Sequence, residues 1–515
     1  MGNNHHATNR VITDAFSTGR DGLSTLNRLS TAASNCLSER EAENKCLHLG
    51  LKSGLLLLAL TGCAMGPDYQ APEAQAPANW QAVPTAVTVS SEHPALKQWW
   101  QSFQDPLLDS LMAKALADNP DLKIAMARIE QARAERKGTR AELFPKVNAV
   151  VGAQRNENPF PGFAPGLRFN LFELGFDALW EIDLFGRQQR RFEAASADFE
   201  AVGEQYRQLM LSLNAELART YIDYRRLQHE MSITRDNLQT QQHTLELTER
   251  LVVEGVASRH DVIRVRAQLE TLSSQIPLLE AELSARLRTL EVLVGEHPGA
   301  LQLELSASGA LPEAPAEVLL LSPADSLRQR PDLRAAERRL AAATAMQGAA
   351  IAELFPKISL SAFFGLRDTD IETLFKSSAF SYGTAANLLQ PLLNWGRIQA
   401  GIDLAEARQR EAYWSYQKVT LDVLKEIEST LIHYLKQEIR RQSLDASVKD
   451  LRESLRLSRL RYQEGVSSML DVLEAHRALY INEVALLNAK ASAAIDWIAL
   501  YKAMGAGLSE SEVVK

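Results

Sequence analysis

Apolar and polar residues alternate strictly along two stretches of the chain, and such a period of two predicts β-strands. The apolar positions of the first stretch are Phe172, Leu174, Phe176, Ala178, Trp180 and Ile182, and those of the second are Ile358, Leu360, Ala362, Phe364 and Leu366. The intervening positions of the first stretch carry Glu173, Asp177, Glu181 and Asp183. Four unpaired carboxylates cannot be buried in a dry core, so that face meets water. The opposite face is too apolar for open solvent, and a length of ~10 residues suits a tilted transmembrane strand.

Two other stretches have apolar residues every seven positions, which predicts left-handed coiled coils. The seven-residue columns are Leu217, Tyr224, Met231, Leu238, Leu245 and Val252, and then Ile427, Tyr434, Arg441, Val448, Leu455 and Tyr462. The first helix runs from Arg187 to Arg250 or beyond, which is ~96 Å at 1.5 Å per residue. The chain then reverses at Gly255 and again at Gly465. We expect Pro277 to kink the helix that returns from the first reversal.

The hexapeptide AELFPK occurs at 141–146 and again at 352–357, an offset of 352 − 141 = 211 residues. Its neighbours recur at offsets of 211 or 210, so the chain is two structural copies of about 200 residues. Helices are predicted over 121–143 and 332–354, and each ends at the repeated Phe-Pro, because proline cannot continue a helix. Each copy then supplies two strands. Eight strands would leave no aqueous lumen, so three chains and twelve strands are the smallest channel.

The N-terminal part has the form of a lipoprotein signal. The apolar run Leu55–Leu60 is too short to span a membrane, follows Lys52, and ends at Leu60-Thr61-Gly62-Cys63. We expect residues 1–62 to be an extension and signal peptide, with translation starting near Leu47 or Leu51. Cys63 would be the lipidated first mature residue, and a Pro- and Ala-rich linker would cover 63–105. The other interpretation of the apolar run is a fragment of buried helix.

Composition excludes several classes of function. The net charge is −8 from 56 basic and 64 acidic residues that are mixed throughout, which argues against nucleic acid. No cysteine lies between Ala64 and Lys515, so neither a disulfide framework nor a thiol site is expected there. No enzyme signature is present, and the histidines on the predicted helices have no metal-ligand partner at i+4. We therefore expect no catalytic residue, no metal and no cofactor apart from the covalent lipid.

The signal, the motif GPDYQAP at 66–72, the duplicated strand hairpins and the duplicated helical hairpins together resemble the TolC-like outer membrane factors, in particular their lipoprotein branch, the NodT family. The resemblance covers Leu55 to Gly505. It implies a homotrimer with a twelve-stranded outer membrane barrel and a helical periplasmic tunnel. It also implies the exit duct of a tripartite pump that exports drugs or other toxic compounds, with a periplasmic adaptor and an inner-membrane transporter of the resistance-nodulation-division class.

The corresponding organisation is a first repeat over 106–295, a linker over 296–322, a second repeat over 323–505 and a tail over 506–515. Two other functions fit parts of the pattern. The same channel could serve type I protein secretion, although the lipoprotein signal and GPDYQAP disfavour this. A coiled-coil scaffold of the cell envelope would have the helices and no barrel.

Two groups of site residues follow from the resemblance. The reversals would contact the adaptor through Gly255, Val256, Ser258, Gly465, Val466 and Ser467. The closed periplasmic entrance would be lined by Asp471 and Glu474, which lie three apart on one helical face. Tyr462 would tie the closed helices together, and Arg264 would pair with the acids from the other hairpin. An ordinary solvated acidic face remains the alternative for Asp471 and Glu474.

Overall fold

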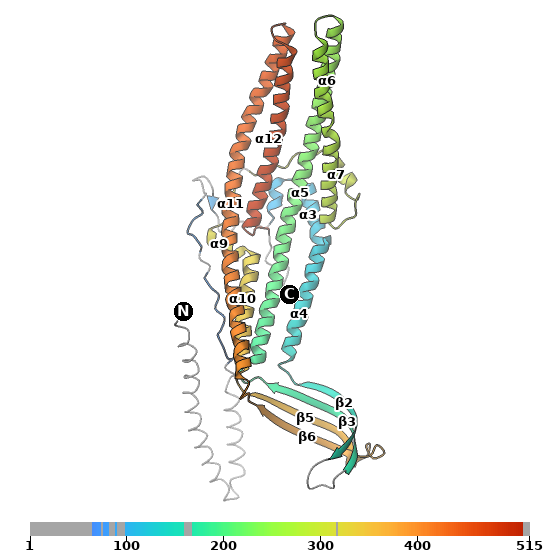
Figure 1. The fold of residues 1–515 in the computed structure, drawn as a ribbon, viewed down its shortest axis with the longest axis vertical. Helices are drawn as coiled ribbons and strands as arrows, with labels where there is room; N and C mark the ends of the chain where they lie inside the picture. Colours follow the sequence, from blue (N-terminus) through green and yellow to red (C-terminus); the bar gives the residue numbers. More distant parts are fainter. Residues whose placement is uncertain are drawn as a thin grey trace. The chain divides into compact units, whose positions relative to one another are not determined.

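The computed structural model describes residues 64–73, 76–81, 88–89, 98–158, 167–315 and 318–507 (Figure 1). The signal peptide, Cys63, much of the linker and residues 508–515 lie outside the described residues. The described part of the chain is mainly helical and contains one four-stranded sheet. Its α-helices are α3 (Pro106–Asp118), α4 (Pro120–Ala141), α5 (Arg187–Val253), α6 (Arg259–Ser273), α7 (Gln275–Leu293), α8 (Gln302–Ser306), α9 (Pro323–Gln329), α10 (Pro331–Ala352), α11 (Trp395–Gln463) and α12 (Met469–Ala503).

The repeated Phe-Pro converts helix to strand in both copies, as predicted. Helix α4 ends at Ala141 and β2 begins at Lys146, while α10 ends at Ala352 and β5 begins at Lys357. Proline also starts both of these helices, where its missing N–H is not needed. The side chain of Asn119 caps α4 by accepting from the backbone N–H of Asp121 at 2.8 Å.

The sheet consists of β2 (Lys146–Asn158), β3 (Leu167–Ile182), β5 (Lys357–Asp368) and β6 (Phe380–Leu389), in that order and antiparallel throughout. The central pairing of β3 with β5 joins the two copies. Phe176 lies opposite Phe364, and Ala178 lies opposite Ala362. Opposed residues share a face, so the predicted apolar face is continuous across the sheet. On the other face Glu173 pairs with Arg367 at 3.0 Å.

The outer edges of β2 and β6 have no strand partner among the described residues. Large apolar side chains on these strands remain exposed, including Val151 at 81% and Tyr382 at 76%. An open edge with an exposed apolar face is a site for pairing with another strand. A short parallel pair, β1 (Thr88–Val89) with β4 (Leu319–Leu320), forms a separate ribbon.

The long helices form two hairpins, α5 with α6 and α7, and α11 with α12. The returning helix of the first copy divides at Ser274, and Pro277 lies in the first turn of α7. The predicted interruption is therefore confirmed, three residues before the proline. The matching helix α12 is continuous, with Leu487 at the position equivalent to Pro277. None of the described helices combines the length and the apolarity needed to cross a bilayer.

The main apolar core joins many segments that lie far apart in sequence, from Trp80 to Ala506. The short helix η2 (Trp99–Phe103) brings Trp99 and Phe103 against Trp497 of α12, with ring centroids 6.0 and 5.3 Å apart. Trp497 stacks on Tyr501 at 3.8 Å. Residues of α5 and of several other helices, among them α3, α7 and α11, also belong to the cluster. Trp99, Trp100 and Phe103 are all buried.

Candidate functional site

Both hairpins reverse through the same glycine turn. Gly255 has φ +75° and Gly465 has φ +70°, a conformation that side chains disfavour. The backbone N–H of Val256 donates to the carbonyl of Leu251 at 2.9 Å, and that of Val466 donates to Arg461 at 2.8 Å. These six-residue bonds are the Schellman arrangement that ends helices. A Cβ on either glycine would meet nothing within 4 Å, so the glycines are required by the backbone conformation rather than by packing.

A serine and an aspartate start the returning helix of each hairpin. Asp261 accepts from the backbone N–H of Ser258 at 3.1 Å, and Asp471 accepts from that of Ser468 at 3.0 Å. Both pairs are capping boxes, which satisfy backbone donors at a helix start. The bonds from Ser258 hold the pKa of Asp261 below its usual value. The Ser-x-x-Asp spacing in the sequence indicates a capping box. The sequence analysis interpreted Asp471 only as a gate residue and missed its role in the capping box.

The tips expose apolar side chains. Val256 is 73% exposed and Val466 is 68% exposed, while Ser258 is exposed and Ser467 is half-buried. Another protein could therefore contact these exposed side chains. Their contact with an adaptor stays a prediction.

An apolar cluster joins the two hairpins close to the tips. Its buried members are Leu245, Val262, Val265 and Leu473. Leu473 belongs to α12, and its side chain faces the first hairpin. Asp471 and Glu474 are exposed on another side of the same helical turn. The acids are therefore accessible and take no part in the apolar contact with the first hairpin.

Tyr462 lies half-buried at the end of α11. Burial raises its pKa, and the negative charge of Asp261 on the first hairpin raises it further. Tyr462 is thus within electrostatic reach of the other hairpin. No ion pair joins Arg264 to Asp471 or Glu474 in the part of the chain that the structure describes, although the charge of Arg264 helps to lower the pKa of Asp261. The pairing of Arg264 with the acids stays a prediction.

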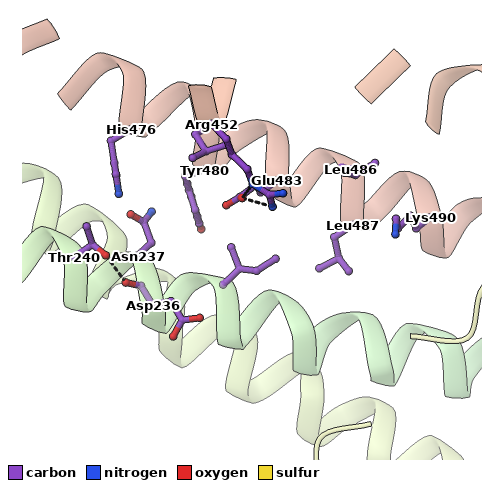
Figure 2. Close-up of a pocket in the computed structure, with 12 residues that line it drawn as sticks. Asp236, Asn237, Thr240, Arg452, His476, Tyr480, Glu483, Leu486, Leu487 and Lys490 are labelled. Carbon is purple, nitrogen blue, oxygen red and sulfur yellow. Dashed lines mark hydrogen bonds and ion pairs between the residues drawn. The ribbon is translucent and has the colours of Figure 1, made fainter. Parts of the chain in front are cut away.

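A cleft of about 430 Å³ separates α5 from α12 farther from the tips (Figure 2). Figure 2 shows His476 and Tyr480 of α12 pointing toward α5, which contributes Asn237. The Nδ1 atom of His476 and the Oδ1 atom of Asn237 are buried and have no hydrogen-bond partner among the described atoms. The interface between the hairpins is therefore loosely packed here and carries unsatisfied polar groups.

Polar contacts tie the hairpins together beside the cleft. The hydroxyl of Tyr480 donates to Oε1 of Gln275 at 2.7 Å and lies 3.2 Å from the hydroxyl of Thr234. Gln275 is the first residue of α7, directly after the break at Ser274. One side chain of α12 thus contacts both helices of the first hairpin at its interruption. No such contact was visible in the sequence.

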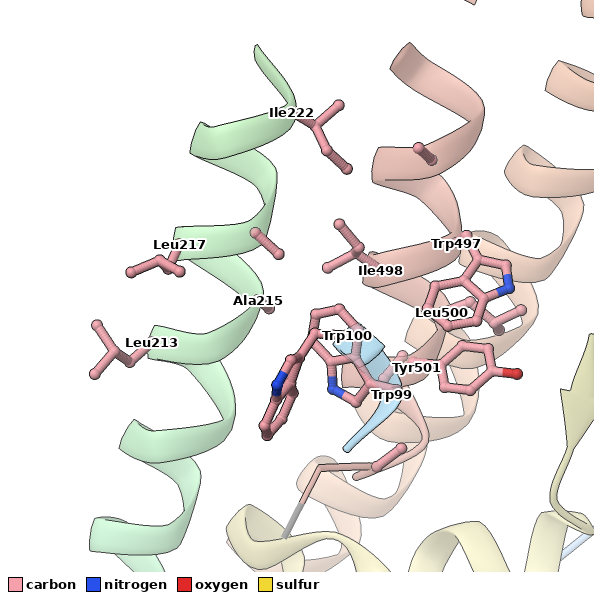
Figure 3. Close-up of a cluster of buried hydrophobic side chains, with 14 of the residues drawn as sticks. Trp99, Trp100, Leu213, Ala215, Leu217, Ile222, Trp497, Ile498, Leu500 and Tyr501 are labelled. Atoms are coloured by element: carbon pink, nitrogen blue, oxygen red, sulfur yellow. The ribbon is translucent and has the colours of Figure 1, made fainter. Parts of the chain in front are cut away.

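The contact between α5 and α12 changes character toward the sheet. There the apolar core fills the space between them, and Ile222 of α5 and Ile498 of α12 point toward each other (Figure 3). A dry core is costly to open, whereas a partly polar interface is less so. The two hairpins are therefore firmly joined at the core and weakly joined at the cleft. No cluster of three or more His, Cys, Asp or Glu suited to a metal ion occurs among the described residues.

The chain is similar to known outer membrane proteins along most of its length. The family model described as outer membrane efflux protein matches residues 111–296 and 323–506. The pyoverdine export outer membrane protein OpmQ of Pseudomonas aeruginosa is 31% identical over 478 residues, which cover 89% of this chain and 97% of OpmQ. Nodulation protein T of Rhizobium leguminosarum bv. trifolii is 28% identical over 448 residues, which cover 86% of this chain and 93% of that protein.

A solved structure has the same arrangement. The outer-membrane channel OprN superposes with a TM-score of 0.82 at 33% identity, covering 86% of this chain and 99% of that chain.

We predict that Asp471 and Glu474 restrict the periplasmic entrance. Replacing both by Ala should raise conductance in planar bilayers and weaken cation selectivity, because like charges crowded around a narrow axis bind cations. Asp471→Ala also removes the N3 half of the capping box of α12. Asp261→Ala removes the matching cap of the first hairpin and serves as the control. A double variant with wild-type conductance and selectivity would show that these carboxylates do not line the entrance.

We predict that acid loosens α12 from α5. Burial lowers the pKa of His476, and Arg459 lowers it further against the opposing effect of Glu483. The stability of the closed interface is therefore full above the unfolded pKa of about 6.5 and is lost as the pH falls toward the lower folded value. The protection factors of the α12 amides, which correct for the pH dependence of intrinsic exchange, should fall several-fold between pH 7.5 and pH 5.5.

The His476→Gln variant should lose this change in protection between pH 7.5 and pH 5.5. The control variant His243→Gln, which replaces an exposed histidine of α5, should keep it. Equal pH steps in wild type and His476→Gln would contradict the assignment.

Proposed function

The chain belongs to the outer membrane efflux protein family, and from this premise we propose that it is the outer membrane exit channel of a tripartite export system. The recognition of a NodT-type outer membrane factor is confirmed by the family match and by the similarity to nodulation protein T. The family and the relatives are channels and export ducts rather than enzymes. The protein supplies a passive path, and the inner-membrane transporter supplies the energy.

The observation that carries this proposal is the four-stranded sheet with one continuous apolar face, one charged face and two open edges. In a membrane every backbone polar group needs a partner, so β2 of one chain must pair with β6 of the next. Three chains close twelve strands into a barrel wide enough for a lumen. The apolar face then meets lipid, and the face with Glu173 and Arg367 meets water.

The helices account for the path through the periplasm. Helix α5 has 67 residues and α11 has 69, which correspond to ~100 Å each. Both begin at the sheet and end at the glycine turns, so the turns lie far from the membrane. We propose that the turns dock on a periplasmic adaptor. The adaptor would connect the channel to an inner-membrane transporter of the resistance-nodulation-division class.

Small molecules are the cargo that we propose. OpmQ is named for the export of pyoverdine, which supports a small-molecule export role for this chain as well. The rival function, type I protein secretion, predicts loss of a secreted protein rather than accumulation of small compounds when the gene is deleted. A scaffold without a channel predicts no conductance from the purified trimer.

We predict that deleting the gene in its native host lowers resistance to exported compounds and increases accumulation of a fluorescent efflux dye. The wild-type gene should restore both. The Gly465→Arg variant should not, because bulk and charge at the turn obstruct the adaptor while the trimer, assayed by heating in detergent, stays intact. Gly465→Asn is the matched control, since Asn tolerates the left-handed conformation. Full resistance with Gly465→Arg would refute a role of this turn in docking.

We also propose that Cys63 is the acylated N-terminus of the mature protein. Mass spectrometry of protein from its native membrane should find acyl groups on Cys63 and nothing upstream of it. Each buried methylene contributes about 0.8 kcal/mol, and the barrel adds its own anchorage, so Cys63→Ser should still insert in part if it is exported. An unmodified N-terminus upstream of Cys63 would overturn this proposal.

A further inference from the structure

Residues Ala64–Tyr69, here called the strap, lie bonded to the junction between the sheet and the helices. The backbone N–H of Met65 donates to the carbonyl of Phe185 at 3.1 Å. Phe185 lies between the end of β3 at Ile182 and the start of α5 at Arg187. The strap therefore begins where the chain leaves the sheet.

The side chain of Arg190 in α5 contacts both the backbone and a side chain of the strap. Its Nε atom donates to the carbonyl of Met65 at 3.2 Å, and its Nη2 atom lies 2.6 Å from Oδ1 of Asp68. The side chain of Arg190 is only 6% exposed, whereas that of Asp68 is 88% exposed. A buried guanidinium needs partners for its donors, and the strap supplies three of them, since Nη2 also donates to the carbonyl of Gly66 at 3.5 Å. Glu193 accepts from Nη1 at 2.9 Å.

Glycines clear the space in which the strap lies. A Cβ on Gly186 would lie 2.6 Å from Cα of Ala64, and a Cβ on Gly348 would lie 2.9 Å from the carbonyl oxygen of Met65. A Cβ on Gly66 of the strap would lie 2.5 Å from Cα of Gly348. Side chains at these positions would displace the strap. Gly186, Arg190 and Gly348 are here called the groove.

The far end of the strap packs on the second copy. The hydroxyl of Tyr69 donates to Glu337 of α10 at 2.5 Å, and the guanidinium of Arg338 lies 5.6 Å from the centre of the ring. Tyr69 also covers a set of small residues from α5 and α10, namely Ala194, Ala197, Ala341, Ala342 and Ala345. The strap thus contacts α5 of the first copy and α10 of the second.

The duplication provides an internal comparison. At the offsets of 210 and 211 residues, Gly186 corresponds to Gly396, Arg190 to Ala400 and Gly348 to Lys137. A Cβ on Gly396 would meet nothing within 4 Å. The buried arginine and the second glycine are therefore absent from the equivalent positions. The repeat fold therefore forms without Arg190 and Gly348, and these two residues occur only in the copy positions that contact the strap.

We propose that the groove is a receptor for the strap and that Arg190 is the positioning residue that fixes the attachment point of the preceding part of the chain at the boundary between sheet and helices. The docked strap also holds the two copies together at that boundary. The inference rests on the proposed function in one respect: the lipid proposed for Cys63 would be attached next to Ala64. Docking would then keep the anchor and the barrel in register during assembly.

Hydrogen exchange of the full-length trimer in detergent tests docking without reference to export or to lipid. In the Arg190→Ala variant the amide of Met65 should exchange at least tenfold faster than in wild type. Arg191→Ala is the matched control, because this neighbouring arginine of α5 is half-exposed and forms its ion pair with Glu353, at 3.9 Å, rather than with the strap. Asp68→Ala removes the other partner of the same ion pair. Because Asp68 is exposed, this variant should fold even if Arg190→Ala does not. Wild-type exchange in both Arg190→Ala and Asp68→Ala would overturn the receptor.

Pulse-chase assembly in cells tests the positioning role. We expect Arg190→Ala to reach the heat-resistant trimer more slowly than wild type and Arg191→Ala, with Arg190→Lys between them because lysine restores the charge but not the forked donors. Wild-type assembly together with fast Met65 exchange would overturn the positioning role. Normal strap protection in a protein without export activity would instead contradict the proposed function alone.

Discussion

The unpaired edges of the four-stranded sheet are the constraint on which the rest of the structure depends. A membrane offers no water to the backbone groups of β2 and β6, so these edges must find strands of other copies. Once the sheet closes into a barrel, each chain passes from strand to long helix at the same two places, the turns that precede α5 and α11. The arrangement of the long helices around a common axis follows from this closure rather than from contacts among the helices alone.

The helical hairpins differ in how firmly they are held along their length. Along Leu213–Tyr224 of α5, the contact with α12 passes through a dry core that contains Trp497 and Trp99. Farther out, the contact passes through a cleft with unsatisfied polar atoms and then through a small apolar cluster at the tips. Opening the outer part costs less than opening the inner part, because less apolar surface would be exposed. A duct that opens only at its periplasmic end requires such a gradient.

The two copies differ at the positions that make contacts found in one copy only. The returning helix is broken at Ser274 in the first copy and continuous in the second, and Tyr480 of the continuous helix contacts the break. Arg190 and Gly348 hold the strap, while Ala400 and Lys137 stand at the equivalent positions. The duplication thus supplied a symmetric frame, and individual substitutions in one copy supplied the asymmetric contacts.

The sequence by itself determined the elements and much of the architecture. Strand alternation, the seven-residue columns, the Phe-Pro switches and the turn glycines are local signals, because period and backbone conformation depend on neighbouring residues. The Ser-x-x-Asp capping boxes were equally local and could have been recognised. The tertiary structure alone decided that Leu473 packs against the first hairpin while Asp471 and Glu474 stay exposed, that Tyr480 meets Gln275, and that Arg190 meets Asp68. Each of these contacts joins segments that lie far apart in the chain, and no sequence period encodes which distant side chains packing will bring together.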